Sequence, residues 1–157
     1  MSLRAMFTVC ATLALTVLMA TGARADQAGE VNQVDGVALH GFDPVAYFKE
    51  HKAVKGEAQT TAVYKGVTYE FASKEDQAEF QANPEKYVPQ YGGFCAFAVA
   101  KGVKADIDPH EFAIHDDKLY LYYRDRALQA YEGDVKGNTE AANHNWPEVA
   151  KQSKIIH

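Results

Sequence analysis

The sequence is poor in cysteine, in tryptophan and in basic residues. Its 157 residues include two cysteines and a single tryptophan, Trp146. So few cysteines cannot build the disulfide framework on which many small secreted domains depend. Lys and Arg number 16 against 21 Asp and Glu, which gives a formal net charge of −5 at pH 7. This acidic, evenly mixed charge argues against nucleic acids and anionic membranes as partners.

Long apolar runs are also missing, except at the N-terminus. Residues 7–20 are almost uninterruptedly apolar, follow the basic Arg4, and lead to an Ala-Arg-Ala sequence at 23–25. These are the three parts of a secretory signal peptide, and the run is short for a membrane span of about 20 residues. We predict a signal peptide over 1–25 that is cleaved after Ala25. The mature protein is expected to be periplasmic or secreted, with no stable membrane insertion.

Cleavage would leave one domain with one cysteine. Cys10 would be removed together with the basic residues Arg4 and Arg24. Residues 26–157 would then carry 14 Lys and Arg against 21 Asp and Glu, a formal charge of −7. A chain of this length is typical of a single domain. With Cys95 alone, no internal disulfide can form. A lone thiol in an oxidising compartment must be buried, bound to a metal, paired with another molecule, or used chemically.

Alternation and capping residues predict short helices and two antiparallel hairpins. Apolar residues alternate on either side of Lys65-Gly66 and of Asp116-Asp117, which is typical of hairpins. Asp43 before Pro44 is a typical helix start, because proline is tolerated at the first helical position. The expected elements are an extended polar arm over 26–38, a helix over 43–48, hairpins over 60–72 and 112–123, helices over 73–83, 84–87 and 124–131, and a polar helix over 133–150 with Trp146-Pro147 as its hydrophobic plug.

The two hairpins resemble each other. In the first, the alternating residues are Thr61, Val63, Val67, Tyr69 and Phe71. A shift of 51 positions brings Tyr69, Phe71 and Phe80 onto Tyr120, Tyr122 and Tyr131. This indicates a weak internal duplication of a hairpin–helix unit, although any two such units look alike to some degree. The predicted fold is a small single α+β domain, with antiparallel hairpins packed against short helices and a core over about 37–149.

The segment over residues 87–102 contains Cys95. Gly92-Gly93 comes just before this cysteine and predicts a sharp turn, because glycine tolerates backbone angles that a Cβ forbids. The apolar run that follows ends at Gly102, which predicts a short buried helix. The start of a helix favours a thiolate, so the pattern predicts a lowered Cys95 pKa. The alternative is a small buried hydrophobe, the usual role of a free cysteine.

Several long motifs resemble those of the exported bacterial YHS-domain proteins. They are GFDPVAYF, TAVYKGVTYEFASKED, FQANPEKYVPQYGGFCAFAVAKG, DPHEFAIHDDKLYLYY and NWPEVA, in that order. Together they span about 37–149. The resemblance implies a small α+β domain in which short helices pack on antiparallel hairpins. We expect a protein without enzymatic activity. The resemblance also relates the chain to a wider superfamily of heavy-metal-associated modules, which contain several cysteines. In this sequence, two of those cysteine positions are occupied by Ala46 and Ala72.

The resemblance therefore leaves one thiolate for metal binding. We expect a soft or borderline metal, copper most plausibly and zinc as the other choice, because both accept thiolate and imidazole ligands. Cys95 is the expected thiolate ligand. His40 is the first expected co-ligand, since it precedes the segment that holds metal ligands in superfamily members. His144, beside Trp146, is the second.

Two other functions remain open. A reactive Cys95 thiolate could serve thiol redox chemistry, but the mature chain offers no resolving cysteine, so a partner molecule would be needed. The protein could instead be a small binding module with neither metal nor redox chemistry. Its pocket would be aromatic, and the candidate lining residues are Tyr64, Tyr69, Tyr87, Tyr91, Phe94 and Phe97.

Overall fold

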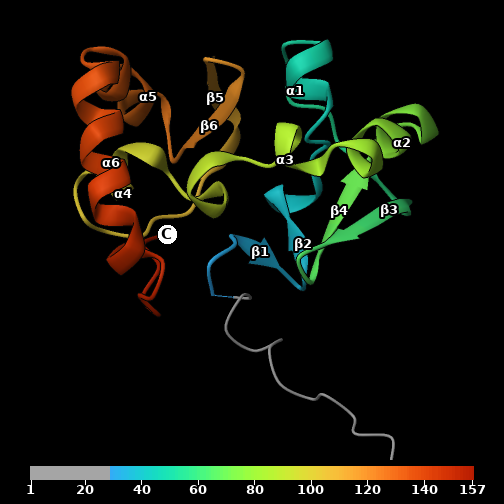
Figure 1. Ribbon diagram of the computed structural model, residues 1–157, viewed down its shortest axis with the longest axis horizontal. Helices are drawn as coiled ribbons and strands as arrows, with labels where there is room; N and C mark the ends of the chain where they lie inside the picture. Colours follow the sequence, from blue (N-terminus) through green and yellow to red (C-terminus); the bar gives the residue numbers. More distant parts are fainter. Residues whose placement is uncertain (1–28) are drawn as a thin grey trace, which may run out of the picture.

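The computed structural model describes residues 29–157, and the predicted signal peptide lies outside this part of the chain (Figure 1). Six α-helices and two small sheets form a mixed α+β domain. The α-helices are α1 (Ala46–Lys49), α2 (Lys74–Ala82), α3 (Pro84–Tyr87), α4 (Ala96–Ala100), α5 (Asp125–Glu132) and α6 (Val135–Val149). The strands are β1 (Gln33–Val34), β2 (Val37–Ala38), β3 (Glu57–Tyr64), β4 (Val67–Phe71), β5 (Asp108–His115) and β6 (Lys118–Tyr122), and two 3-10 turns, η1 (Leu39–Gly41) and η2 (Gln90–Gly93), complete the fold.

The two predicted hairpins form the centres of the two sheets. The first sheet has the order β1-β2-β4-β3, in which β3 and β4 are antiparallel and β2 joins β4 in parallel. The second sheet contains only β5 and β6, which are antiparallel. These observations confirm the predicted fold class, a small single α+β domain.

The N-terminal segment differs from the prediction of an extended arm. Residues 33–38 form the β1–β2 hairpin instead, with Asp35-Gly36 at its turn. Both turn residues have positive φ, 52° and 82°. An Asp-Gly pair is a strong hairpin signal because it adopts such angles readily. The amide of Thr68 then donates to the Gly36 carbonyl at 3.1 Å, which attaches this hairpin to β4.

The inward face of β3 also differs from the predicted alternation. Val63 is 68% exposed, whereas Ala62 is buried. The cause is the two-residue turn at Lys65-Gly66, where φ is 47° and 81°. This turn pairs Ala62 with Tyr69. Directly opposed residues share a face of the sheet, so Ala62 follows the buried Tyr69 inward and Val63 points outward.

Side-chain caps begin two of the predicted helices. The Ser73 hydroxyl accepts a hydrogen bond from the Asp76 amide at 3.1 Å and begins α2, and the helix ends at Asn83-Pro84. Asp43 accepts from the Val45 amide at 2.8 Å before α1. Such caps satisfy backbone donors that the first helical turn leaves unpaired.

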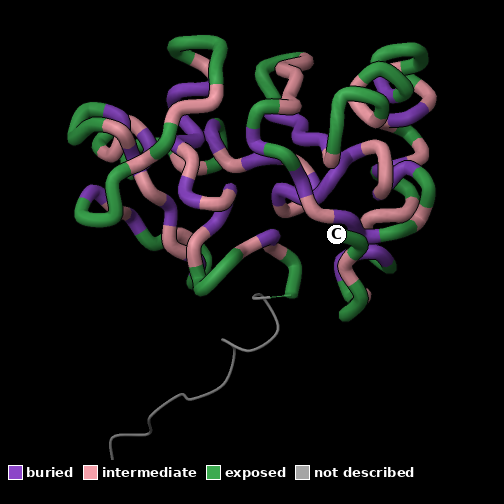
Figure 2. Tube along the Cα trace, turned by 180° about the vertical axis from the view of Figure 1, so that it is seen from behind, coloured by how far each residue is buried: buried purple, intermediate pink, exposed green. Residues whose placement is uncertain are grey.

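The core contains two clusters of aromatic rings, one behind each hairpin. Phe80 of α2 lies 4.9 Å from the Tyr69 ring and 5.1 Å from the Phe71 ring, measured between centroids. In the second half, the Tyr131 ring lies 5.8 and 5.3 Å from those of Tyr120 and Tyr122. Each aromatic pair contributes about 0.5–1.5 kcal/mol beyond its buried area. Figure 2 shows the buried segments running through the interior, with exposed segments at the outer loops.

The hairpins of the two halves correspond in their spacing. Strand β3 begins at residue 57 and β5 at 108, while β4 begins at 67 and β6 at 118, so that both pairs differ by 51. Each hairpin also contains a register shift near the start of its first strand. The shared ancestry of the two halves stays a prediction. Within residues 29–157, no helix is both long and apolar enough to cross a membrane.

Candidate functional site

A strained turn delivers Cys95 to the start of α4, as predicted. Tyr91, Gly92 and Gly93 have φ of 51°, 60° and 77°. The Phe94 amide then donates to the Tyr91 carbonyl at 3.0 Å and closes the turn. Gly92 has no room for a side chain, because a Cβ there would lie 1.8 Å from the main-chain oxygen of Glu30. The N-terminal segment is therefore packed directly against this turn.

The Cys95 side chain is buried, with 1% of the residue exposed. Burial raises the pKa of its thiol, the nearby backbone amides of Ala98, Tyr123 and Phe97 lower it, and the net change is upward. The sulfur receives no capping hydrogen bond from α4. The prediction of a lowered pKa is therefore wrong. The physical reason is that α4 has only five residues and the sulfur lies away from water, so that desolvation of the thiolate outweighs the donors.

Asp43 has the equivalent surroundings in the first half of the chain. Its Oδ1 accepts hydrogen bonds from the amides of Val45 and Ala46 at 2.8 and 3.3 Å. Its Oδ2 accepts one from the Ala72 amide at 2.8 Å. The carboxyl group is fully buried. Three backbone donors, two at a helix start and one after a strand, thus bind the Asp43 carboxylate. Three amides at the corresponding positions of the second half act on the Cys95 sulfur.

The equivalence extends along the main chain. The Asp43 amide donates to the Val54 carbonyl at 2.9 Å, and the Cys95 amide donates to the Ala105 carbonyl at 3.0 Å. The preceding η1 turn also has three successive positive φ angles, of 55°, 52° and 76°, ending at Gly41. We call each set of three amides an amide cradle. The Asp43 cradle is formed by Val45, Ala46 and Ala72, and the Cys95 cradle by Phe97, Ala98 and Tyr123.

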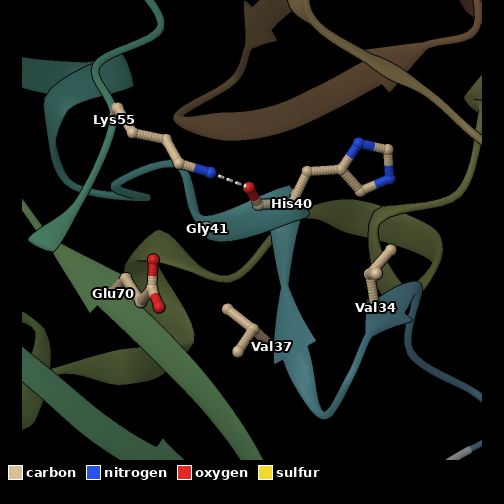
Figure 3. A pocket seen from close by; sticks show the side chains of 6 residues that line it. All are labelled: Val34, Val37, His40, Gly41, Lys55 and Glu70. Carbon is tan, nitrogen blue, oxygen red and sulfur yellow. Dashed lines mark hydrogen bonds between the residues drawn. The ribbon is translucent and has the colours of Figure 1, made fainter. Parts of the chain in front are cut away.

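His40 lines an open cleft of about 380 Å³ (Figure 3). The Lys55 ammonium donates a hydrogen bond to the His40 carbonyl. Figure 3 shows the imidazole pointing away from Lys55 and Glu70, which lie on the other side of the cleft. The His40 Nε2 atom lies 2.8 Å from Oδ1 of Asp106. The imidazole of this predicted ligand is therefore bound to a carboxylate outside the cleft.

The structure does not gather the three predicted metal ligands into a cluster. Cys95 is buried at the start of α4, His40 is bound to Asp106, and His144 lies exposed on α6. Across residues 29–157, no three His, Cys, Asp or Glu side chains converge in a way that could hold a metal ion.

A second cavity, of about 180 Å³, lies beside the β3–β4 hairpin. We call it the aromatic pocket and define it by Tyr64, Tyr69, Val88 and Trp146, which line it together with Glu30, Val31, Lys65, Pro89 and Gly92. Two of the residues predicted to line an aromatic pocket, Tyr64 and Tyr69, do line this cavity. The other predicted residues, Tyr87, Tyr91, Phe94 and Phe97, are not among those that line this cavity.

Polar groups in and beside the aromatic pocket differ in whether they form hydrogen bonds within the protein. Glu85 binds both the Tyr64 hydroxyl and the Lys65 ammonium, the latter at 2.9 Å, and these contacts hold the Glu85 pKa below its usual value. In contrast, Tyr69 and Trp146 line the cavity without a side-chain hydrogen bond to another of residues 29–157, and neither polar atom is among the fully buried, unpartnered ones. The cavity is mostly apolar, and two of its lining residues each carry a hydrogen-bond donor.

Sequence reasoning missed Trp146 as a lining residue. Trp146 was predicted to be a hydrophobic plug, and its ring does pack 5.9 Å from Tyr91 and 6.4 Å from Phe94. Its pocket role depends on where α6 packs, which no local pattern reveals. Its being the only tryptophan was the one available signal.

Comparison with known families finds one match, which lies in the first half of the described structure. The YHS domain family matches residues 45–91, which run from the start of α1 into η2. No curated protein and no solved structure matches the chain. The match covers α1, the β3–β4 hairpin, α2 and α3, and it ends before Cys95. Residues 45–91 are thus similar to the YHS domain, and the second hairpin–helix half lies outside the match.

Proposed function

We propose that this YHS-domain protein is an exported, non-enzymatic binding protein that holds a small aromatic molecule in the aromatic pocket. The observation that carries the proposal is the pocket itself: Tyr64, Tyr69 and Trp146 line one cavity, and Tyr69 and Trp146 each carry a hydrogen-bond donor. Ligand sites are typically concave and apolar, with a few polar groups that fix orientation.

The size of the cavity limits the ligand. An apolar cavity of about 150 Å³ accommodates benzene, and the aromatic pocket has about 180 Å³. A single aromatic ring with one small substituent therefore fits. A hydroxyl or carbonyl oxygen on that ring would accept a hydrogen bond from Tyr69 or Trp146 and satisfy a donor that otherwise has no partner.

Copper or zinc binding by Cys95, His40 and His144 receives less support. A metal needs a deprotonated thiol and several converging ligands. Burial raises the pKa of Cys95, and the imidazole of His40 is held by Asp106. A metal at Cys95 would have to displace these contacts, whereas an aromatic ligand would enter a cavity that already exists.

Tryptophan fluorescence provides the test, because Trp146 is the only tryptophan. Titration with phenol is expected to change its emission with a Kd of about 1 mM, since a ligand of about seven heavy atoms contributes on the order of 4 kcal/mol. Cyclohexanol, of similar size but without an aromatic ring, is expected to bind more weakly. Val88→Phe should fill the pocket and abolish binding. Val63→Phe, the same change on the outer face of β3, should leave it intact.

Two results would contradict the proposal. One is phenol binding that is unchanged in Val88→Phe. The other is anaerobic Cu(I) competition in which the wild type binds tightly and Cys95→Ser does not, while phenol causes no change. The second result would restore the metal function at Cys95.

A further inference from the structure

The outer face of the first sheet carries two valines, where an open sheet face usually has polar residues. The register pairs Val34 with Val37, and Val37 with Thr68. Directly opposed residues share a face, and side chains alternate along a strand. Both valines therefore lie on the face that Thr68 and Glu70 occupy, while the buried residues of β4 lie on the other. Val34 is 52% exposed, so this apolar strip is open to a ligand.

Beside the apolar strip, a positive and a negative side chain converge over Gly41. A Cβ at Gly41 would lie 2.5 Å from Oε2 of Glu70 and 2.8 Å from Nζ of Lys55. These two side chains and the two valines Val34 and Val37 line the same His40 cleft (Figure 3). Its volume of about 380 Å³ falls within the range of roughly 300–1,000 Å³ that is typical of small-molecule sites.

The two charged groups in the cleft are not paired with each other. Among residues 29–157, no hydrogen bond or ion pair engages the Glu70 carboxylate. The Lys55 ammonium donates one hydrogen bond to the His40 carbonyl and lies 5.0 Å from the centroid of the Phe42 ring. An ammonium has three N–H donors, so two of them remain for a ligand. The bridge between Phe42 and Lys55 fixes the main chain from which this ammonium extends.

We propose that the His40 cleft binds a free aliphatic α-amino acid. The α-carboxylate accepts hydrogen bonds from Lys55, the α-ammonium donates to Glu70, and the aliphatic side chain covers Val34 and Val37. In an α-amino acid both charged groups are attached to one carbon atom, and the cleft likewise holds its two charges close together over Gly41. Hydrogen bonds between charged groups are about twice as strong as those between neutral groups.

A ligand with a single charge fits the cleft less well. A carboxylate bound to Lys55 would lie near the Glu70 carboxylate, and an ammonium bound to Glu70 would lie near the Lys55 ammonium. Either arrangement adds repulsion between like charges, which a ligand with both charges offsets. The His40 cleft shares no lining residue with the aromatic pocket, so this inference does not depend on the proposed function.

A two-dimensional ¹H–¹⁵N NMR titration with L-leucine tests the proposal. We expect the Gly41 and Lys55 amides to shift together with one Kd of about 1 mM, while the Trp146 indole signal stays in place. Isoamylamine is leucine without its carboxylate, and isocaproate is leucine without its ammonium. Each should bind about tenfold more weakly than leucine, because each loses one charge-assisted hydrogen bond.

Two variants locate the charges. Glu70→Gln keeps the shape of the side chain but removes its charge, and Lys55→Met removes the ammonium. Each should weaken leucine binding about tenfold. The matched control is Glu111→Gln, since Glu111 is also half-buried but lies in β5 of the other sheet. This control should bind leucine as the wild type does.

The proposal is overturned if leucine causes no saturable shift at Gly41 and Lys55. Binding of isoamylamine or isocaproate as tight as that of leucine would refute recognition of both charges. Equal leucine affinities in Glu70→Gln and Glu111→Gln would exclude the Glu70 carboxylate as the partner of the ammonium and overturn the proposed site.

Discussion

Replacing Cys95 with aspartate tests whether the two amide cradles are equivalent. A carboxylate in a protein interior without partners costs several kcal/mol. In the Cys95 cradle it would meet three amide donors, each worth about 1.5–3 kcal/mol to a charged acceptor. These gains offset most of the desolvation, so we expect Cys95→Asp to destabilise the protein by no more than about 2 kcal/mol.

The control is Val99→Asp. Val99 is fully buried and lies in the same helix, α4, but its side chain has no cradle of amides. Here the desolvation is not offset, and a loss of about 4 kcal/mol or more is expected. Urea unfolding followed by Trp146 emission compares the two variants. A Cys95→Asp loss as large as that of Val99→Asp would refute the equivalence of the cradles.

The pH dependence of Cys95→Asp sharpens the test. Burial raises the pKa of Asp43, with the nearby charge of Asp76 adding to the effect. An aspartate at position 95 should likewise have a raised pKa in the folded state. The folded state then binds a proton more tightly than the unfolded state, so stability falls as pH rises through the folded pKa. The variant should therefore come closest to the wild type in acid, below the ordinary aspartate pKa, and a difference that does not depend on pH would contradict this.

Three further predictions concern packing, ionisation and processing. Gly92→Ala should lower the free energy of unfolding in urea by about 2 kcal/mol more than Gly66→Ala does. Both glycines have positive φ, but of the two only Gly92 lies against a main-chain oxygen, so equal losses of stability would refute the close approach. Burial raises the pKa of Tyr47 and Tyr122 in the folded state. The free energy of unfolding should therefore fall above about pH 10, where these tyrosines ionise first in the unfolded state, and their phenolate absorbance should rise only as the protein unfolds. Protein recovered from the cell envelope should have a mass that begins at Asp26, and a mass that still includes residues 1–25 would refute cleavage.

Local sequence patterns predicted the elements because the signals lie within a few residues of each other. The Lys65-Gly66 and Asp116-Asp117 turns, the Ser73 cap and the Gly92-Gly93 turn all depend on short-range geometry. The face of β3 was mispredicted because the alternation on one strand does not reveal which partner each residue opposes. The strand register that the Lys65-Gly66 turn imposes determines which β3 side chains face the core.

The candidate sites depend on packing between distant segments, which the patterns do not encode. Tyr69 and Trp146 line one cavity although they belong to different halves of the chain, and the burial that raises the Cys95 pKa is a tertiary effect. One signal for the paired cradles was present in the sequence. Gly-Phe precedes both Asp43 and Cys95, and a comparison of these two tripeptides would have placed the cysteine opposite an aspartate.

The most direct test of the proposed function is to map where an aromatic ligand binds. In a two-dimensional ¹H–¹⁵N NMR titration with phenol, we expect the Trp146 indole signal and the Tyr64 and Gly92 amides to shift together, with one shared Kd. The amides of Gly41 and Lys55, in the His40 cleft, should not move. Shifts confined to that cleft, or no saturable shift at Trp146, would contradict the proposal that the aromatic pocket is the binding site.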